Sequence, residues 1–169
     1  MLLKKKAFLC ELCVSVVKNK PMFNHLLIVC VGNICRSPTA EYLLKKQLQE
    51  KGATITVESA GIAALVGKPA SPTAVTLAAE AGVDMTPHRA RQLTPGLIRS
   101  HDLILVMEQG HIKAVESMAP EARGKVHLLG RWQHNIEIPD PYRQGDAAYQ
   151  HALELIQKTT RQWASKLSL

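Results

Sequence analysis

The segment from residue 25 to residue 52 constrains the fold more than any other part of the chain. An apolar run predicts a buried strand at 25–30, and leucines at helical spacing predict an amphipathic helix at 37–51 that stops at Gly52. Only a few residues separate these elements, so the connection must be a tight loop. A strand, a loop and a helix in this order are typical of the units that build parallel sheets.

The loop between these elements reads VGNICRSP and has the composition of an anion-binding loop. Gly32 and Asn33 are residue types that tolerate left-handed backbone conformations. We expect Ser37 to cap the helix, with Pro38 at its first position. Such a loop turns successive backbone N–H groups inward at the positive end of a helix dipole, which makes a site of phosphate size.

Cys30 and Arg36 bracket this loop, with five residues between them. The field of the loop and helix stabilises a thiolate at Cys30 over the thiol. Arg36 adds a planar, permanently charged fork that can hold two phosphate oxygens. A cysteine at the end of a buried strand is often only a small core residue, but the surrounding pattern favours a nucleophile. The loop lacks the second glycine and lysine of the nucleotide-hydrolase phosphate loop, which excludes that class.

The rest of the chain alternates apolar strands with amphipathic helices. The pattern predicts strands at 54–59, 103–106 and 126–129, and helices at 71–82, 95–100, 109–118 and 146–166. This alternation predicts an α/β domain with a parallel sheet, helices on both faces and right-handed crossovers. No apolar stretch approaches the length that a membrane span needs.

Charge is distributed unevenly along the 169 residues, which hold 21 lysines and arginines against 14 aspartates and glutamates. Residues 1–21 carry five lysines and one glutamate, so the remainder is only mildly basic. A mild excess suits a small anionic site and is poor evidence for nucleic-acid binding. We interpret 1–21 as a flexible extension, because a glutamate interrupts its short apolar run and no small-residue cleavage site follows. The domain itself is expected at 22–169.

Two motifs about a hundred residues apart resemble those of the low-molecular-weight protein tyrosine phosphatases. The first is VCVGNICRSP at the loop, and the second is Asp140-Pro141-Tyr142 near the C-terminus. The resemblance implies a three-layer α/β/α fold with four parallel strands in the order 2-1-3-4 and a phosphate-binding loop after the first strand. It also implies that the segment at 59–71 and the Asp140 loop flank the site.

The same resemblance implies hydrolysis of phosphotyrosine through a phosphocysteine, without a metal or cofactor. Cys30 is the expected nucleophile. Asp140 is the expected general acid on the phenolate leaving group, and then the general base on water. Leu65 and Tyr142 are expected to form the walls that contact the substrate. The expected phosphate-binding residues are Val31, Gly32, Asn33, Ile34, Cys35 and Arg36.

Ser37, Ser59 and His88 match family positions that form a hydrogen-bonding network behind the loop. In that network Asn33 holds a strained backbone conformation and the Ser37 hydroxyl faces the Cys30 sulfur. Cys35 is either a buried packing residue or, as the resemblance implies, the disulfide partner that traps an oxidised nucleophile before it reaches sulfinic acid. No cysteine follows this position, which excludes a disulfide framework, and a thiolate nucleophile implies a reducing compartment, the cytoplasm.

Two regions depart from the animal members of the family. Residues 63–66 read AALV where those relatives often carry an aromatic residue, and Arg143 stands where they often carry a tyrosine. Leu65 and Arg143 resemble instead the enterobacterial branch, which partners tyrosine autokinases of capsule and exopolysaccharide export. This branch implies a phosphotyrosine protein as substrate, a membrane tyrosine autokinase, with no nucleic-acid partner and no stable membrane insertion of the phosphatase.

Two other functions are compatible with parts of the pattern. An arsenate reductase shares the fold and a similar loop, but it relays electrons through further cysteines, and none follows Cys35. A non-catalytic phosphoprotein-binding module would be marked by loss of Cys30, Arg36 or Asp140, and all three are present. Turnover of p-nitrophenyl phosphate in EDTA separates the three functions.

Overall fold

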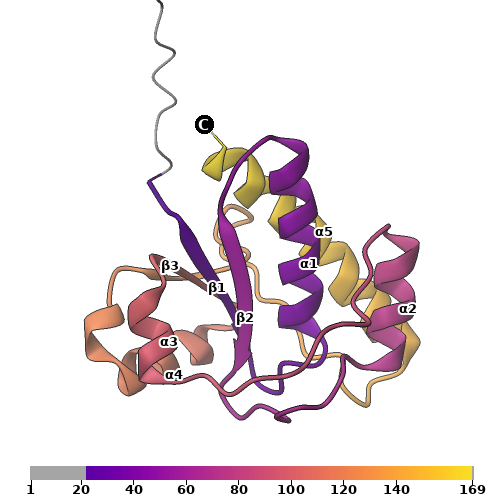
Figure 1. Cartoon of the computed structure of the whole chain (residues 1–169). Helices are drawn as coiled ribbons and strands as arrows, with labels where there is room; N and C mark the ends of the chain where they lie inside the picture. The colour runs from indigo at the N-terminus through magenta and orange to yellow at the C-terminus, as the bar shows by residue number, and fades with distance from the viewer. Residues whose placement is uncertain (1–21, 169) are drawn as a thin grey trace, which may run out of the picture.

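The computed structural model describes residues 22–168 and shows a parallel sheet between two layers of helices (Figure 1). The strands are β1 (His25–Cys30), β2 (Thr56–Gly61), β3 (Leu103–Val106) and β4 (Val126–Leu128). They are parallel and lie in the order β2-β1-β3-β4, which confirms the expected topology. The extension expected at 1–21 lies outside the described residues.

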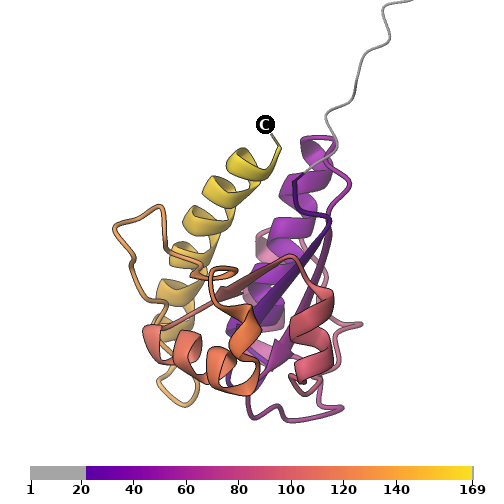
Figure 2. The ribbon, with the colours of Figure 1, turned by 90° about the vertical axis from the view of Figure 1, so that its left-hand side faces the viewer.

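Five α-helices and one short 3₁₀ helix flank the sheet within the described residues (Figure 2). They are α1 (Arg36–Glu50), α2 (Pro72–Glu80), α3 (Pro95–Ser100), α4 (Gln109–Met118), η1 (Pro120–Ala122) and α5 (Asp146–Leu167). Helices α1, α2 and α5 contribute to the core on one face of the sheet. The core on the other face is formed with α3, α4 and η1. The predicted three-layer architecture is therefore confirmed.

The strand β1 lies in the middle of the sheet and is buried on both faces. Leu26, Ile28 and Cys30 point into one core, whereas Leu27 and Val29 point into the other, as the two-residue period of a strand requires. This alternation fixes the register, because a slip by one residue would exchange the two faces. The end of β1 is thereby held rigidly at the carboxyl edge of the sheet, where ligands bind in open α/β folds.

Several local predictions differ from the structure, and helix α2 ends at Glu80, two residues before the expected end. β2 starts and ends two residues later than expected, because its pairing with β1 continues to Gly61, which lies opposite Cys30. The prediction of Ser37 as the cap of α1 is wrong: the helix begins at Arg36, Cys35 occupies the N-cap position, and no side chain caps it. The Ser37 hydroxyl is engaged instead with Cys30 and Asn33.

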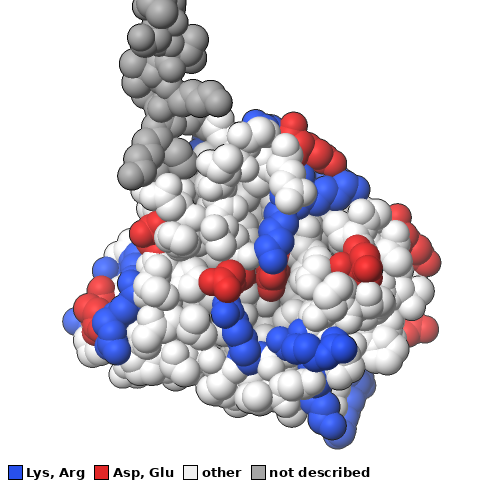
Figure 3. Space-filling view, viewed as in Figure 1, with Lys and Arg blue, Asp and Glu red and all other residues white. Residues whose placement is uncertain are grey.

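Charged side chains do not form a field of one sign on the face drawn in Figure 3. Lysines and arginines lie there interspersed with aspartates and glutamates. This pattern agrees with the mild net charge of the domain and gives no extended basic surface on that face for a nucleic acid. Within the described residues, none of the helices has the length and hydropathy to cross a membrane.

Gly61 couples the sheet to the loop, and its substitution tests that coupling. A Cβ at this position would lie 2.4 Å from the Val31 carbonyl oxygen and 3.0 Å from Ala64. We expect Gly61→Ala to lower the stability by about 1–3 kcal/mol, because backbone must move to admit the methyl group. Turnover, the activity that the family resemblance implies, should fall with it, because the displaced carbonyl belongs to the loop.

Gly110→Ala is the matched control. This position lies in α4, and nothing lies within 4 Å of an added Cβ. It should keep turnover and gain slightly in stability. Thermal melts and p-nitrophenyl phosphate turnover of both variants are the measurements. A Gly61→Ala protein that matches the wild type in both would show that the loop does not depend on this contact.

Candidate active site

The loop between β1 and α1 turns sharply at Asn33. This residue has a φ of 56°, the left-handed conformation expected for it, whereas Gly32 does not have a positive φ. A left-handed asparagine is tolerated because its short side chain can bond to nearby groups. The bend brings the Asn33 amide back toward the nucleophile position, with its N–H 3.3 Å from Cys30 Sγ.

The carbonyl groups of the loop point away from its centre and accept hydrogen bonds from flanking segments. The segment after β2 supplies the donors for three of them, with Ile62, Ala63 and Leu65 N–H groups donating to the carbonyls of Cys30, Val31 and Gly32. The Ile34 carbonyl accepts from the Ser71 N–H, and the Asn33 carbonyl accepts from His88 Nε2 at 2.7 Å. A carbonyl can only accept, so His88 carries its proton on Nε2.

The N–H groups of the loop point the other way. Among the described residues, no hydrogen-bond partner is found for the backbone N–H groups of Val31, Gly32, Ile34, Cys35 and Arg36. The loop lines a cavity of about 190 Å³ at the end of β1. Unpaired donors around a cavity at the start of a helix form an anion site, since each donor needs an acceptor. Five of the six expected phosphate-binding residues line this space; Asn33 does not, because its N–H faces Cys30 Sγ.

A chain of hydrogen bonds behind the loop leads to the Cys30 sulfur. Asn33 Nδ2 donates to Ser37 Oγ and to Ser59 Oγ, both at 2.9 Å. Asn33 Oδ1 accepts from the backbone N–H of Arg91, which can only donate, so the orientation of the amide is fixed. Both serine oxygens therefore accept from Asn33, and both hydroxyl hydrogens are free to donate further.

Each serine donates to an acidic partner. Ser37 Oγ lies 2.9 Å from Cys30 Sγ, where its hydrogen stabilises a thiolate. Ser59 donates at 2.5 Å to Glu41 Oε2, a buried carboxylate that also pairs with Lys45. The sequence reading missed Glu41. Its position four residues after Ser37 on the same helix face is the signal that could have indicated it.

Arg36 lies at the mouth of the cavity, between two carboxylates. Its side chain is 2% exposed, and Nη2 lies 2.8 Å from Asp140 Oδ2. Nη1 donates to Glu108 and, at 2.9 Å, to the Ile138 carbonyl. Sequence reasoning missed Glu108, although it follows β3 closely at the carboxyl edge of the sheet. The two predicted residues, Arg36 and Asp140, are thus in direct contact across 104 residues of sequence.

Leu65 and Tyr142 form apolar walls at the opening of the cavity. They are 45% and 44% exposed and come from the segment after β2 and from the Asp140 loop. The Asp140 loop is held by a turn in which the Tyr142 N–H donates to Asp140 Oδ1 at 3.2 Å. Arg143, with a φ of 60°, places its guanidinium 5.2 Å from the Tyr142 ring centroid. The opening of the cavity is therefore hydrophobic, whereas the loop at its base is polar.

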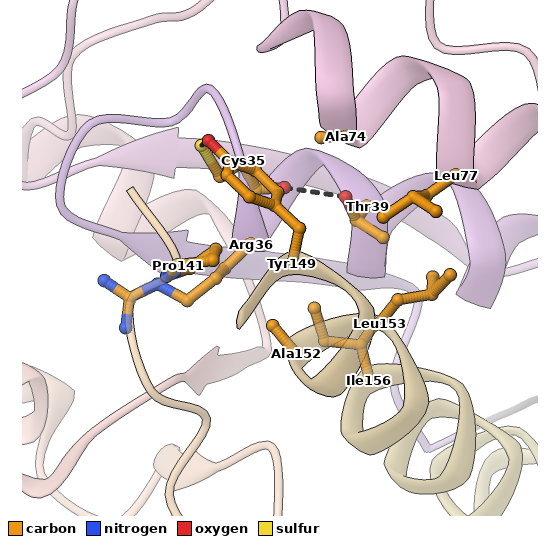
Figure 4. A pocket seen from close by; sticks show the side chains of 10 residues that line it. All are labelled: Cys35, Arg36, Thr39, Ala74, Leu77, Pro141, Tyr149, Ala152, Leu153 and Ile156. Atoms are coloured by element: carbon orange, nitrogen blue, oxygen red, sulfur yellow. Dashed lines mark hydrogen bonds between the residues drawn. The ribbon is translucent and has the colours of Figure 1, made fainter. Parts of the chain in front are cut away.

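Cys35 contributes its N–H to the loop, but its side chain points away into a small pocket beneath α5 (Figure 4). Its thiol lies 3.3 Å from the Tyr149 hydroxyl, to which Ser71 also donates at 3.1 Å. Burial raises the pKa of the Cys35 thiol, and burial together with the contact to Cys35 raises the pKa of Tyr149 to about 12. Both groups are thus protonated at neutral pH. Cys30 and Cys35 are free thiols in this structure.

His111, on α4, lies beside the carboxylate that holds Arg36. Its Nε2 is 3.7 Å from Glu108 Oε1, and its buried Nδ1 has no hydrogen-bond partner among the described residues. Burial lowers the pKa of His111, although Glu108 acts in the opposite direction. The ring is therefore neutral at pH 7. No cluster of three or more His, Cys, Asp or Glu side chains suited to a metal ion occurs in the described part of the chain.

The neutral state of His111 predicts a pH dependence of stability. Folding lowers the pKa of His111 from 6.5. At a pH between the two pKa values, His111 is therefore mostly protonated in the unfolded chain and mostly neutral in the folded chain. Stability from this group is present above about pH 6.5 and is lost as the pH falls toward the folded-state pKa. We expect His111→Gln to lose less stability than the wild type between about pH 7 and pH 5.

Urea unfolding across this pH range is the measurement. His134→Gln, an exposed histidine in the loop after β4, serves as the matched control and should follow the wild type. Equal pH slopes for the wild type and His111→Gln would contradict the assignment.

The comparisons with known proteins agree on one family. Residues 25–169 match the model of the low molecular weight phosphotyrosine protein phosphatases. The tyrosine phosphatase Wzb of Escherichia coli K12 is 51% identical over 147 residues, which is 87% of this chain and 97% of that protein. Etp from the same strain is 46% identical over 146 residues, with 86% and 96% covered.

Solved structures show the same similarity in three dimensions. Wzb of Vibrio vulnificus in complex with benzylphosphonate matches with a TM-score of 0.82 and 51% identity, over 86% of this chain and 99% of that one. The YwlE arginine phosphatase of Geobacillus stearothermophilus matches with a TM-score of 0.78 and 31% identity, over 85% and 92%. The chain therefore belongs to the low molecular weight phosphotyrosine protein phosphatase family.

Proposed function

We propose that this chain hydrolyses phosphotyrosine in proteins through a phosphocysteine at Cys30. The observation that carries the proposal is the ring of unpaired loop N–H groups around the cavity that Cys30 lines, with Arg36 and Asp140 at its mouth. A phosphoryl group in this ring would place its three equatorial oxygens on the loop amides and Arg36, where the charge of the transition state resides.

In the first step the Cys30 thiolate attacks phosphorus in line, and the S–P bond forms as the P–O bond to the phenol breaks. Ser37 supports the thiolate through its 2.9 Å contact with the sulfur. Asp140 gives its proton to the leaving oxygen, because a phenolate with a conjugate pKa of about 10 is a poor leaving group. The product phenol then departs between Leu65 and Tyr142.

The ion pair between Arg36 and Asp140 gives this step an order of events. In the structure Nη2 of Arg36 is occupied by the Asp140 carboxylate at 2.8 Å. An arriving phosphoryl group must replace Asp140 at that nitrogen. The released carboxylate then takes up a proton from solvent and carries it to the leaving oxygen. Glu108 and the Ile138 carbonyl remain on Nη1 and keep the guanidinium in place.

In the second step water attacks the phosphocysteine, and the S–P bond breaks to regenerate the Cys30 thiolate. Asp140 accepts a proton from the water and is thereby reprotonated. Apart from substrate and water, the groups that act in these two steps are side chains and backbone N–H groups of the chain.

The substrate class follows from the shape and chemistry of the opening. The walls formed by Leu65 and Tyr142 suit an aromatic ring above the polar cradle. Benzylphosphonate, the ligand named for the Vibrio relative, has this combination of a ring and a phosphorus oxyanion. We extend the proposal to a membrane tyrosine autokinase of capsule or exopolysaccharide export as the substrate protein, and to the cytoplasm as the location, because the nucleophile requires a reducing environment.

We include a protective role for Cys35 in the proposal. A peroxide would oxidise Cys30 to a sulfenic acid; the Cys35 thiol would then attack that sulfur, forming a disulfide and releasing water. Both cysteines are free thiols, and Cys35 would have to turn away from Tyr149 to react.

The direct test compares substrates of two chemical classes that relatives with this fold process. One peptide sequence carrying phosphotyrosine or phosphoarginine is incubated with the chain in EDTA, and phosphate release is measured. We expect efficient release from the phosphotyrosine peptide and none from either peptide with Cys30→Ser. Faster release from the phosphoarginine peptide would overturn the substrate assignment and leave the cysteine mechanism intact.

A prediction for Asp140 depends on the leaving group. Asp140→Asn keeps the size of the side chain and removes the proton donor. Turnover should fall strongly for phenyl phosphate, by about 10²–10⁴-fold, as expected for loss of general acid catalysis. The loss should be smaller for p-nitrophenyl phosphate, whose leaving group departs with little help.

Single-turnover phosphorylation of Cys30 across a series of aryl phosphates measures this dependence. Asp146→Asn, a change of the same kind at the start of α5, is the matched control and should leave the series unchanged. An Asp140→Asn protein slowed by one constant factor for every leaving group would mean that another residue is the acid.

A further inference from the structure

A second concave surface lies at the C-terminal ends of α1 and α5. Two adjoining hollows of about 390 and 440 Å³ share Arg161 and Ser165. We call this surface the Trp132 groove and define it by its principal lining residues, which are Glu50, Lys51, Trp132, Arg161, Ser165 and Lys166. None of these residues takes part in the catalytic site described above.

The Trp132 groove is remote from the nucleophile. Helix α1 begins at the phosphate-binding loop with Arg36 and ends at Glu50. A rise of about 1.5 Å per residue places the groove roughly 20 Å from the loop. Figure 1 and Figure 2 show α1 and α5 side by side, with the C-terminal end of α5 at the end of the molecule away from the loop. A ligand in the groove would therefore not occupy the substrate cavity.

The aromatic side of the groove is a rigid platform. The loop after β4 closes on itself through a bridge between Gly130 and Ile136, and a Cβ at Gly130 would lie 2.1 Å from the Ile136 carbonyl oxygen. Trp132 in this loop packs edge-on against Trp163, with ring centroids 5.5 Å apart. Trp163 is in turn anchored by its Nε1 donating at 2.8 Å to the Leu129 carbonyl. Trp132 nevertheless remains 41% exposed, so part of its indole is accessible to a ligand.

Cations without acidic partners surround this platform. Lys166 Nζ lies 5.3 Å and Arg131 Cζ lies 5.4 Å from the centroid of the Trp132 ring. Within the part of the chain that the structure describes, no salt bridge involves Arg161, Lys166 or Lys51. Glu50 is the single carboxylate on the lining. The lining thus has a net positive charge, with three cations against one carboxylate, and none of these cations is in a salt bridge within the described residues.

We propose that the Trp132 groove binds an extended acidic segment of a partner protein. Carboxylates of the segment would pair with Arg161, Lys166 and Lys51, while its chain packs on the indole. An exposed tryptophan beside arginine is the composition typical of residues that dominate protein interfaces. Residues 1–21 of the chain itself carry five lysines and one glutamate, the wrong charge for this groove.

This proposal does not depend on the proposed function, because its test measures the binding of a peptide and not the hydrolysis of a phosphate ester. The probe is a dye-labelled oligoglutamate peptide, followed by fluorescence anisotropy with the full chain. The groove variant is Arg161→Glu with Lys166→Glu. The matched control is Lys113→Glu with Lys158→Glu, which makes the same change of net charge at exposed positions outside the groove.

We expect the peptide to bind the wild type and the control, and to bind the groove variant at least about tenfold more weakly. Trp132→Ala should also weaken binding. All variants should retain wild-type turnover of p-nitrophenyl phosphate, which shows that they are folded. Phosphate at saturating concentration should not displace the peptide.

Four results would overturn the proposal. They are no binding to the wild type, undiminished binding to the groove variant, equal weakening in the control, and displacement by phosphate, which would place the peptide at the catalytic loop. Vesicles of phosphatidylglycerol and phosphatidylcholine test the other source of negative charge. Loss of vesicle binding in the groove variant, with peptide binding unchanged, would assign the groove to a membrane surface instead.

Discussion

The arrangement of the loop after β1, with carbonyl groups outward and N–H groups inward, is the constraint on which the site depends. A peptide chain normally pairs its donors and acceptors in equal measure. Here the carbonyls are paired with the segment after β2, with Ser71 and with His88, and most of the donors are left for a ligand. Asn33 makes this possible, because its left-handed backbone reverses the chain and its side chain ties the turn to two serines and Arg91.

The charged side chains Arg36 and Glu41 beside the loop are both paired with other groups of the chain. Arg36 is buried and bonded to Glu108 and Asp140, and Glu41 is bonded to Ser59 and Lys45. A buried guanidinium without acceptors would be costly, so these carboxylates stabilise Arg36 as well as orienting it. A phosphoryl group that replaces Asp140 exchanges one anion for another at the same nitrogen. This exchange does not leave Arg36 unpaired.

The sequence was sufficient for the fold and for the parts of the site that are local. Periodicity predicted the strands and helices, and the family resemblance supplied the strand order. The loop composition indicated that Gly32 or Asn33 could be left-handed, and the family resemblance implied a strained Asn33; of the two, Asn33 has the positive φ. Residues whose role depends on distant packing were missed or misread. Glu41 becomes a partner only because β2 brings Ser59 to it, and the Cys35 thiol meets Tyr149 from 114 residues away. The cap predicted at Ser37 was wrong for a local reason, since its hydroxyl is engaged by Asn33 and Cys30 in the same loop.

Titration of ¹⁵N-labelled protein with inorganic phosphate, followed by amide NMR, tests the central claim most directly. If the inward N–H groups form the anion site, the signals of Val31, Gly32, Ile34, Cys35 and Arg36 should move most and downfield in the proton dimension, as each donor gains an acceptor. The Arg36 side chain should respond with them. Loop signals that stay fixed while other amides move would contradict the account, because the phosphate would then bind elsewhere.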